Sequence, residues 1–305
     1  MYTHIEGLIA APYTPFNADG TINLQVIPAY AEMLHRNGVA GAFVCGSTGE
    51  GVSLTTAERI TVTRAWVSSA PAGFKVLVHV GHTSVEDSKV LAKDAQDAGV
   101  YGFATMAPFY FKPASIEALT VYCAEIAATA PQLPFYYYHI PSMTGVSLPM
   151  VDLLRTAGPR IPNMAGIKFT YENLMDFQEC LALENGKYDM LFGRDEILLC
   201  GLTLGTRGGI GSTYNFASSL YLGIIDAFNN GNLAEARRLQ LKSVEMIQYI
   251  VSSGLPFMSA SKAIMGMIGI ECGPPRLPLT SLTKQQIDKF RAGLEKINFF
   301  DYACK

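Results

Sequence analysis

Lys168 is the residue whose surroundings point most directly to covalent chemistry. It lies in a short apolar run, Met164–Phe169, between Ile167 and Phe169. The run has the composition of a buried strand, and burial of a lysine disfavours its charged form. A neutral amine can condense with a ketone to give a Schiff base, whereas an ordinary lysine, with a pKa of about 10.4, is almost fully protonated at pH 7. The alternative is a strand-end lysine that reaches out to solvent, which is the commoner case.

A tyrosine that could move a proton ends another apolar run, Phe135–His139. Because side chains alternate along a strand, Tyr136 and Tyr138 share one face and Tyr137 takes the other. Tyr138 is nearest to the strand end, where its phenol could reach a ligand and act as a general acid or base. For two of the three tyrosines we expect packing alone.

Three further segments are polar or rich in glycine. Gly46–Glu50 reads Gly-Ser-Thr-Gly-Glu, a tight turn whose N–H groups and two hydroxyls could hold a carboxylate, although such residues also simply make turns. Asp195 and Glu196 could cap a following helix or hydrogen-bond a polyhydroxylated substrate, and the two interpretations are compatible. Gly205–Asn215 lacks the phosphate-loop spacing and its lysine, so we expect no phosphate cradle.

His79 and His82 raise the question of a metal site. Three residues apart on a strand, they would face opposite ways, and no nearby Cys, Asp or Glu completes a ligand set. We therefore expect polar loop and core histidines and no metal.

The composition is typical of a soluble globular protein. Of 305 residues, 49% are hydrophobic and 16% charged, and the net charge is -3, so neither nucleic acid nor an anionic membrane surface is an expected partner. No uncharged apolar stretch is long enough to span a bilayer, and no secretory signal is visible. The six cysteines are scattered without metal-ligand spacing, which favours buried free thiols and a cytoplasmic location.

Short apolar runs alternate with helix-period stretches along the chain, at the scale of a βα unit. The predicted strands are Gly7–Ala11, Ala42–Cys45, Lys75–Val80, Gly102–Thr105, Phe135–His139, Ala165–Lys168, Asp189–Phe192 and Gly208–Gly211. Predicted helices between them include Leu24–Asn37, Thr56–Ser69, Glu86–Ala98 and Ser115–Thr129. This pattern predicts an α/β fold, the (β/α)8 TIM barrel, because no Gly-x-Gly-x-x-Gly follows the first strand to favour a doubly wound sheet.

Strand signals cease at about Asn230. Leu233–Val251, Pro256–Met267 and Thr283–Lys296 have the pattern of helices. We therefore predict a barrel over residues 1–229 and a C-terminal helical extension over 230–305, packed on the barrel. In a TIM barrel the active site lies at the carboxyl ends of the strands, where all the chemically notable segments fall.

These segments together resemble the pyruvate-dependent aldolases of the N-acetylneuraminate lyase and dihydrodipicolinate synthase superfamily. The shared parts are Gly46–Glu50, the tyrosine before an x-Ile-Pro turn in Tyr138–Pro141, and Gly166–Lys168. The resemblance covers nearly the whole chain, from about Gly7 to the C-terminal helices. It implies a TIM barrel with a helical C-terminal appendage, and Schiff-base aldol chemistry with pyruvate that needs no cofactor beyond the lysine imine.

Within the superfamily the chain is most similar to the lyase branch. Met143 stands where dihydrodipicolinate synthases usually carry an arginine for a dicarboxylic ligand. Tyr136–Pro141, followed by Thr144–Val146, is close to the animal-type lyase pattern. Gly193–Glu196 and Gly211–Asn215 match lyase segments that bind the hydroxylated tail of sialic acid. The resemblance thus implies reversible cleavage of N-acetylneuraminate to pyruvate and N-acetylmannosamine.

The resemblance also implies a role for each residue. Lys168 would form the imine with C2 of the open-chain sugar, and Tyr138 would move the proton at the C4 oxygen, aided by Ser47. The backbone at Ser47 and Thr48 would bind the carboxylate. The residues expected to hold the sugar portion are Thr170, Gly193, Asp195, Glu196 and Ser212. Arg194 occupies a variable position and carries no expected role.

The assembly follows from the same resemblance. Tyr110 matches a tyrosine that neighbouring subunits contribute to the Tyr138 region, and most members are tetramers, so a homotetramer is implied. Aromatic loop residues also pack for many other reasons.

Two kinds of alternative remain. A dihydrodipicolinate synthase or a 2-keto-3-deoxy sugar acid aldolase would use the same chemistry; Met143 argues against the first. A catalytically silent barrel that binds a pyruvate-like ligand is a different class, and the presence of both Lys168 and Tyr138 argues against it.

Overall fold

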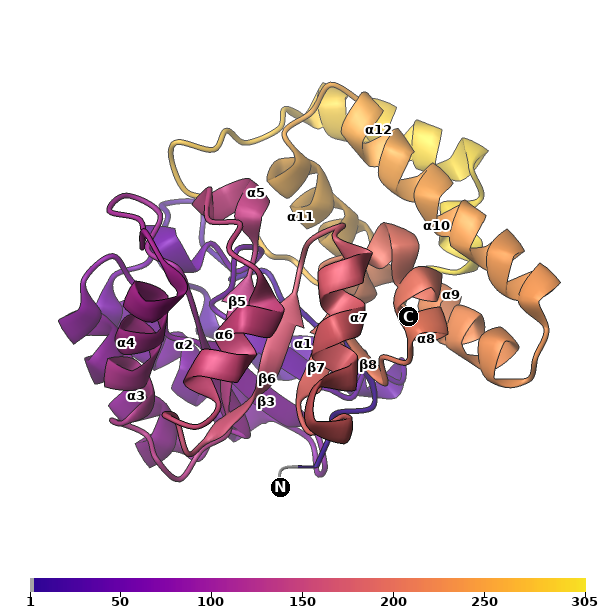
Figure 1. Ribbon diagram of the computed structural model, residues 1–305. Coiled ribbons are helices and arrows are strands. Elements are labelled where there is room, and N and C mark those ends of the chain that lie inside the picture. Colours follow the sequence, from indigo (N-terminus) through magenta and orange to yellow (C-terminus); the bar gives the residue numbers. More distant parts are fainter. Residues whose placement is uncertain (1–2) are drawn as a thin grey trace.

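Eight short apolar runs of the sequence form the eight parallel strands of a closed barrel (Figure 1). This is a computed structural model, and it describes residues 3–305; residues 1 and 2 of the predicted 1–229 barrel lie outside the described residues. The strands are β1 (Gly7–Ala10), β2 (Gly41–Val44), β3 (Lys75–His79), β4 (Gly102–Met106), β5 (Phe135–His139), β6 (Met164–Phe169), β7 (Asp189–Phe192) and β8 (Gly208–Gly211). They follow in sequence order, and β8 pairs with β1 to close the ring. The predicted (β/α)8 barrel is confirmed.

The strand that carries Lys168 is longer than the sequence predicts. We expected it to end at Lys168, but β6 continues to Phe169, which pairs with His139 on one side and Phe192 on the other. Tyr138 and Lys168 face each other in register across β5 and β6. Both side chains are therefore fixed by strand backbone and not by a loop.

Helices surround the barrel. Those that follow the strands are α1 (Ile27–Arg36), α2 (Thr56–Ser69), α3 (Val85–Ala98), α4 (Ile116–Ala127), α5 (Pro141–Thr144), α6 (Met150–Ala157), α7 (Leu174–Ala182), α8 (Leu198–Leu204) and α9 (Tyr214–Asn229), with 3₁₀ turns at Leu24–Val26, Gly51–Ser53, Leu183–Asn185 and Asp195–Ile197. The predicted helix Leu24–Asn37 is divided into a 3₁₀ turn and α1, because Pro28 lacks an N–H and fits the first turn of a helix. Local signals set other ends: Thr55 and Glu58 form a capping box before α2, and Gly99 ends α3 in the left-handed conformation.

Strand alternation divides the core into two layers, as expected for the tyrosines of β5. Tyr136 and Tyr138 belong to the cluster inside the barrel, with Phe43 and Leu191, whereas Tyr137 packs in the layer between strands and helices. Tyr136 donates from its hydroxyl to Asp189 Oδ2 at 2.9 Å, at the beginning of β7. Tyr136 thus fills the amino-terminal part of the barrel interior and leaves the carboxyl end to Tyr138.

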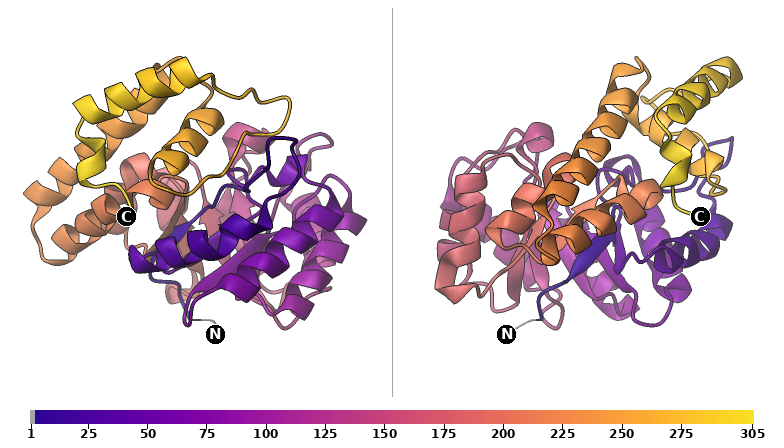
Figure 2. Two further views of the ribbon diagram at one scale, coloured as in Figure 1. Left: turned by 180° about the vertical axis from the view of Figure 1, so that it is seen from behind. Right: turned by 90° about the vertical axis from the view of Figure 1, so that its right-hand side faces the viewer.

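The C-terminal segment forms α10 (Leu233–Ser252), α11 (Phe257–Met267), α12 (Lys284–Lys296) and a 3₁₀ turn, Phe299–Asp301. Figure 1 places α11 and α12 at the same end of the molecule as α5, while the N-terminus lies at the opposite end. Figure 2 shows α10 and α12 side by side, and α10 packs along α9. The division of the chain at residue 229 stays a prediction.

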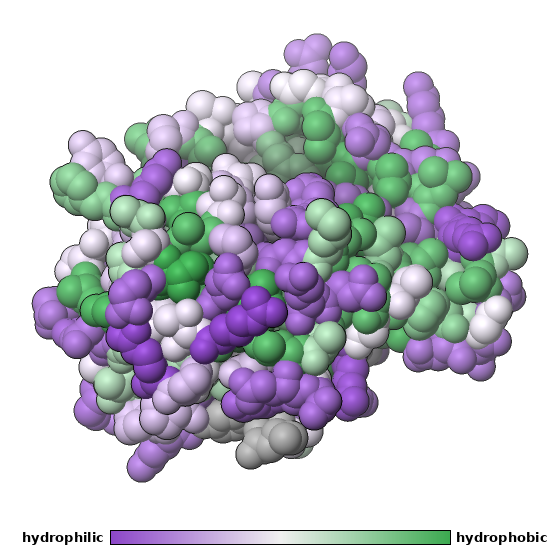
Figure 3. Space-filling model, in the orientation of Figure 1, coloured by the Kyte–Doolittle hydropathy of each residue, from purple (hydrophilic) through white to green (hydrophobic). Residues whose placement is uncertain are grey.

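The surface is mixed in character. Hydrophobic and hydrophilic residues are interspersed on the face shown in Figure 3, and over residues 3–305 no helix has the length and apolar content to cross a membrane. All six cysteines are free; Cys200 is exposed and the others are buried.

Gly166 provides a test of the barrel. A Cβ at this position would overlap the carbonyl oxygen of Asp189 in the neighbouring strand, and backbone cannot move aside as a side chain can. We expect Gly166→Ala to lower the free energy of unfolding by about 3 kcal/mol. Gly223→Ala is the control, because its Cβ would meet only the flexible end of Leu239, so its effect should stay within about 1 kcal/mol. Urea unfolding followed by circular dichroism measures both, and equal stabilities would contradict the assigned β6–β7 packing.

Candidate active site

A cavity of about 290 Å³ lies at the carboxyl ends of the strands. Its walls contain every predicted site residue except Tyr110. Among its lining residues are Ser47, Thr48, Tyr138, Lys168, Thr170, Gly193, Asp195, Glu196 and Ser212. A larger cavity, of about 430 Å³, lies between α11 and α12 and contains none of them.

Lys168 lies inside the barrel with 4% of its surface exposed. Its Nζ is 3.9 Å from the centroid of the Tyr138 ring and 4.4 Å from that of Phe43. Within residues 3–305 it makes no ion pair with a carboxylate, so aromatic faces replace water around it. The sequence predicted this burial, and the amine faces the cavity without a counter-ion among residues 3–305.

Tyr138 is buried, and its hydroxyl points to the turn after β2. The oxygen lies 3.4 Å from Ser47 Oγ, a long hydrogen bond. The ring makes edge contacts with Phe43 and His79, at centroid distances of 5.5 and 5.8 Å. These contacts fix the phenol beside the amine of Lys168, where it can exchange a proton with a bound substrate.

His79 supports this arrangement as a neutral residue. Its Nδ1 lies 3.2 Å from the carbonyl oxygen of Cys45. Burial lowers the pKa of His79 well below its usual range, and the nearby Arg59 lowers it further. His82 lies in the following loop, where its Nδ1 accepts from the N–H of Ser84 at 3.0 Å. Within the described part of the chain, no three His, Cys, Asp or Glu residues group as metal ligands.

The turn Gly46–Glu50 has the tight backbone that its sequence predicts. Cys45, just before the turn, and Glu50, its last residue, have φ values of 57° and 53°, both left-handed. A Cβ at Gly46 would approach the Phe43 ring to 2.9 Å, so the turn packs closely on the residue below Lys168. Glu50 N donates to Ser47 O at 3.1 Å, which closes the turn and presents Ser47 to the cavity.

Asp195 does not cap a helix, which was one of two interpretations. Its Oδ2 accepts from the N–H of Thr213 at 2.9 Å and from the Thr213 hydroxyl at 2.7 Å. Burial raises its pKa to about 6, and the bonds from Thr213 oppose that shift. Gly211 is required beside it, because any Cβ there would overlap the carboxylate.

Arg194, to which the sequence assigned no role, holds the neighbouring carboxylates. It forms ion pairs with Glu172 and with Glu196, the latter at 2.9 Å. Thr170 packs against Gly193, and its hydroxyl oxygen is buried without a partner among residues 3–305. A buried hydroxyl on a cavity wall is available to a ligand.

The apolar side of the cavity was not predicted. Ile247 and Val251 of α10 and Phe257 of α11 line it, although no local signal distinguishes them from other helix residues.

Two residues that the sequence singled out lie outside the cavity. Tyr110 is 76% exposed and Met143 is 66% exposed, and neither lines the cavity.

The comparisons with known proteins all indicate one family. The model of the dihydrodipicolinate synthetase family matches residues 4–297. N-acetylneuraminate lyase from Mus musculus is 40% identical over 299 residues, 97% of this chain and 93% of that protein. The structure of Proteus mirabilis N-acetylneuraminate lyase has a TM-score of 0.93 at 39% identity, covering 97% of this chain and 100% of that one. The sialic acid aldolase of Aliivibrio salmonicida has a TM-score of 0.94 at 38% identity, covering 98% of both chains.

Asp195 makes the stability depend on pH. Its pKa rises from 3.8 to about 6 on folding, so the folded state binds a proton more tightly than the unfolded chain between these values. The resulting stability is present at the acidic end and is lost as pH rises through about 6. We therefore compare the free energies of unfolding of Asp195→Asn and the parent. The difference between them should shift in favour of Asp195→Asn by on the order of 3 kcal/mol as the pH rises from 4 to 7.

Urea unfolding of both proteins at several pH values measures this gain. Asp152→Asn is the control, because Asp152 lies half exposed on α6. A difference between Asp195→Asn and the parent that is the same at pH 4 and pH 7 would contradict the effect of burial.

Proposed function

Because the chain belongs to the dihydrodipicolinate synthetase family, we propose that it is a class I aldolase that cleaves N-acetylneuraminate reversibly to pyruvate and N-acetylmannosamine. The observation that carries the proposal is the buried amine of Lys168, which has no ion pair within residues 3–305 and lies 3.9 Å from the centroid of the Tyr138 ring on the wall of a polar cavity. The substrate is supported by relatives named N-acetylneuraminate lyase that are 39–40% identical over almost the whole chain.

The reaction begins at Lys168. Its Nζ adds to the C2 ketone of the open-chain sugar, and loss of water gives a protonated imine. Cleavage of the C3–C4 bond then sends the electron pair into the imine, which becomes an enamine. Protonation of the enamine at C3 and hydrolysis release pyruvate and restore the amine. The imine is the electron sink, so the mechanism needs no cofactor.

Tyr138 handles the proton at the C4 oxygen. As the C3–C4 bond breaks, the C4 hydroxyl becomes the aldehyde of N-acetylmannosamine and must lose its proton. The Tyr138 hydroxyl, 3.4 Å from Ser47 Oγ, takes this proton as it gives up its own, and the proton that it releases balances the one that the enamine gains at C3. In the reverse direction the same phenol returns the proton to the new alkoxide.

Different residues bind the two ends of the substrate. The N–H groups at Ser47 and Thr48 bind the carboxylate, close to the imine-forming carbon. The sugar portion is held by Thr170, Gly193, Asp195, Glu196 and Ser212, which share the cavity wall. Carboxylates are suitable partners for sugar hydroxyls because each accepts charge-assisted hydrogen bonds.

Two substitutions test the mechanism. Lys168→Ala should abolish both turnover and the pyruvate adduct that borohydride traps. Tyr138→Phe should lower the rate by on the order of 10²–10⁴ while the adduct still forms, because only the proton shuttle is lost. Tyr137→Phe, on the opposite face of β5, should stay close to the parent rate.

Pyruvate release coupled to lactate dehydrogenase measures the rate, and peptide mass locates the adduct. An adduct on another lysine would contradict the role of Lys168, and equal loss of adduct and turnover in Tyr138→Phe would make that residue structural. Comparable activity on 2-keto-3-deoxygluconate would favour the sugar-acid aldolase alternative. A barrel that binds pyruvate without turning over any substrate would favour the silent alternative.

The loop after β4 supports a homotetramer. Tyr110 and Phe111 are 76% and 84% exposed and pack edge to face, with centroids 5.0 Å apart. Contiguous exposed apolar side chains are a common feature of protein interfaces. A neighbouring subunit that covers this loop would bring Tyr110 toward the Tyr138 region of its partner. The free thiols are consistent with assembly in the cytoplasm.

Light scattering after size exclusion tests the assembly. We expect the parent to have the mass of four chains and Phe111→Asp to dissociate into smaller species with reduced turnover, because a charge cannot be buried in an apolar interface without a partner. Met175→Asp, at another exposed apolar residue, should remain assembled. A monomeric parent, or an intact Phe111→Asp assembly, would refute the interface.

A further inference from the structure

A second buried lysine lies outside the cavity chemistry, on α11. Lys262 Nζ forms an ion pair with Glu50 Oε1 at 2.7 Å, and each side chain has 2% of its surface exposed. Glu50 is the last residue of the turn Gly46–Glu50. The pair therefore joins the C-terminal helices to the turn that carries Ser47 and Thr48.

Lys262 is fully engaged. Besides Glu50, its Nζ donates to the carbonyl oxygens of Thr14 at 3.0 Å and Pro274 at 3.1 Å. It also lies 4.3 Å from the centroid of the Phe16 ring. Two donated hydrogen bonds and an ion pair occupy its Nζ, so we do not treat Lys262 as a second nucleophile.

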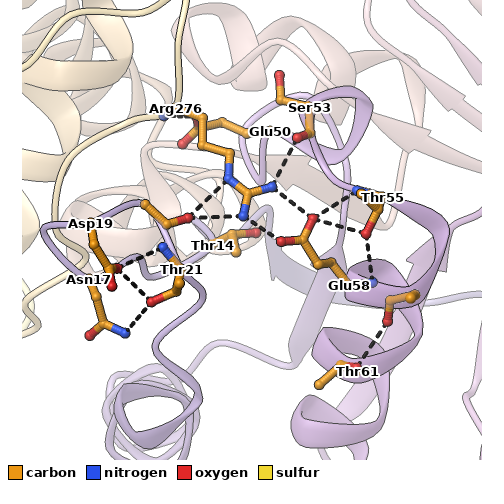
Figure 4. A network of polar contacts seen from close by, with 12 residues as sticks. Thr14, Asn17, Asp19, Thr21, Glu50, Ser53, Thr55, Glu58, Thr61 and Arg276 are labelled. Atoms are coloured by element: carbon orange, nitrogen blue, oxygen red, sulfur yellow. Dashed lines mark hydrogen bonds and ion pairs between the residues drawn. The ribbon is translucent and has the colours of Figure 1, made fainter.

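The other oxygen of Glu50 is held as firmly. Oε2 accepts from the backbone N–H of Arg276 at 2.8 Å. Figure 4 shows the Arg276 side chain continuing to Glu58 on α2 and to the carbonyl oxygen of Ser53, just after the turn. Lys262 of α11 and Arg276 of the connection that follows it thus both contact Glu50, the last residue of the turn.

The turn needs this support because its backbone is strained. Glu50 has φ 53°, a conformation that a residue with a side chain adopts only when its surroundings impose it. Its N–H closes the turn on Ser47 O at 3.1 Å, and Gly51 N closes a second ring on Gly46 O at 3.1 Å. The orientation of the N–H groups at Ser47 and Thr48 depends on this closure.

We infer that Lys262 and Glu50 are positioning residues that hold the keto-acid-binding turn in its active shape. The inference rests on the proposed function, in which Ser47 and Thr48 bind the substrate carboxylate. A buried ion pair contributes little net stability, because desolvation of both charges offsets their attraction, so stability alone does not account for the pair. Phe257 of α11 lines the cavity, and the same helix therefore forms part of its wall and fixes the turn opposite.

Pyruvate titration with borohydride trapping tests the inference on Lys262→Met, Glu50→Gln and the double variant. Each should raise the half-saturating pyruvate concentration by about 10-fold to 100-fold, since small misplacements of binding groups have effects of this size. The adduct at saturating pyruvate should still form on Lys168. The double variant should be more stable to heat than either single variant, because no charge is left buried without a partner, yet keep the raised half-saturation.

Asp189→Asn is the matched control. Its carboxylate is also buried, but it lies at the opposite end of the barrel, where it accepts from Tyr136 and from the N–H of Ile5. This variant should lose stability without a change in half-saturation.

The outcomes separate the two proposals. Half-saturation within twofold of the parent in all three variants would overturn the inference. A double variant that recovers both the stability and the half-saturating pyruvate concentration of the parent would also overturn it. So would an Asp189→Asn variant whose half-saturating pyruvate concentration rises as much as that of the three variants. If the single variants fail to fold, the double variant alone decides. No adduct at Lys168 in the parent would instead refute the proposed function.

Discussion

An amine kept inside a barrel against aromatic rings, with no ion pair to a carboxylate of residues 3–305, is the constraint on which the rest of this structure depends. The two buried lysines of the chain show how specific that arrangement is. Lys262 is neutralised by Glu50 at 2.7 Å, whereas Lys168 faces Phe43 and Tyr138 instead. Burial is similar for both, at 2% and 4% exposed, so the two lysines differ in their partners and not in their exposure to water.

The acidic residues of the cavity are arranged to respect that constraint. Asp195 is directed to Thr213, and Glu196 is paired with Arg194, so each carboxylate has a partner other than the amine. Gly211 makes room for the carboxylate of Asp195. The acidic residues of the cavity thus leave the Lys168 amine without an ion pair among residues 3–305.

Much of the barrel and its cavity could be predicted from the sequence, because side chains alternate along strands and active sites of TIM barrels lie at the carboxyl ends of the strands. Alternation placed Tyr136 and Tyr138 inside the barrel and Tyr137 outside it, and the barrel rule brought Lys168 to the same end as the turn after β2. Contacts between distant segments could not be predicted in this way. Glu50 and Lys262 lie far apart in the sequence, and neither carries a local signal for the other. Likewise, Asp195 sits where a helix cap would, and only side-chain direction shows that it binds Thr213.

The residues that line the cavity come from the ends of different strands. In the proposed mechanism Ser47, Tyr138 and Lys168, on or just after β2, β5 and β6, act at the reacting carbon, while the sugar portion is held by residues after β7 and β8 together with Thr170. On that proposal, bond-making and ligand choice reside largely in separate parts of one scaffold. A barrel built in this way can diverge in the aldehyde it accepts by changing two loops, while its keto-acid chemistry is inherited intact.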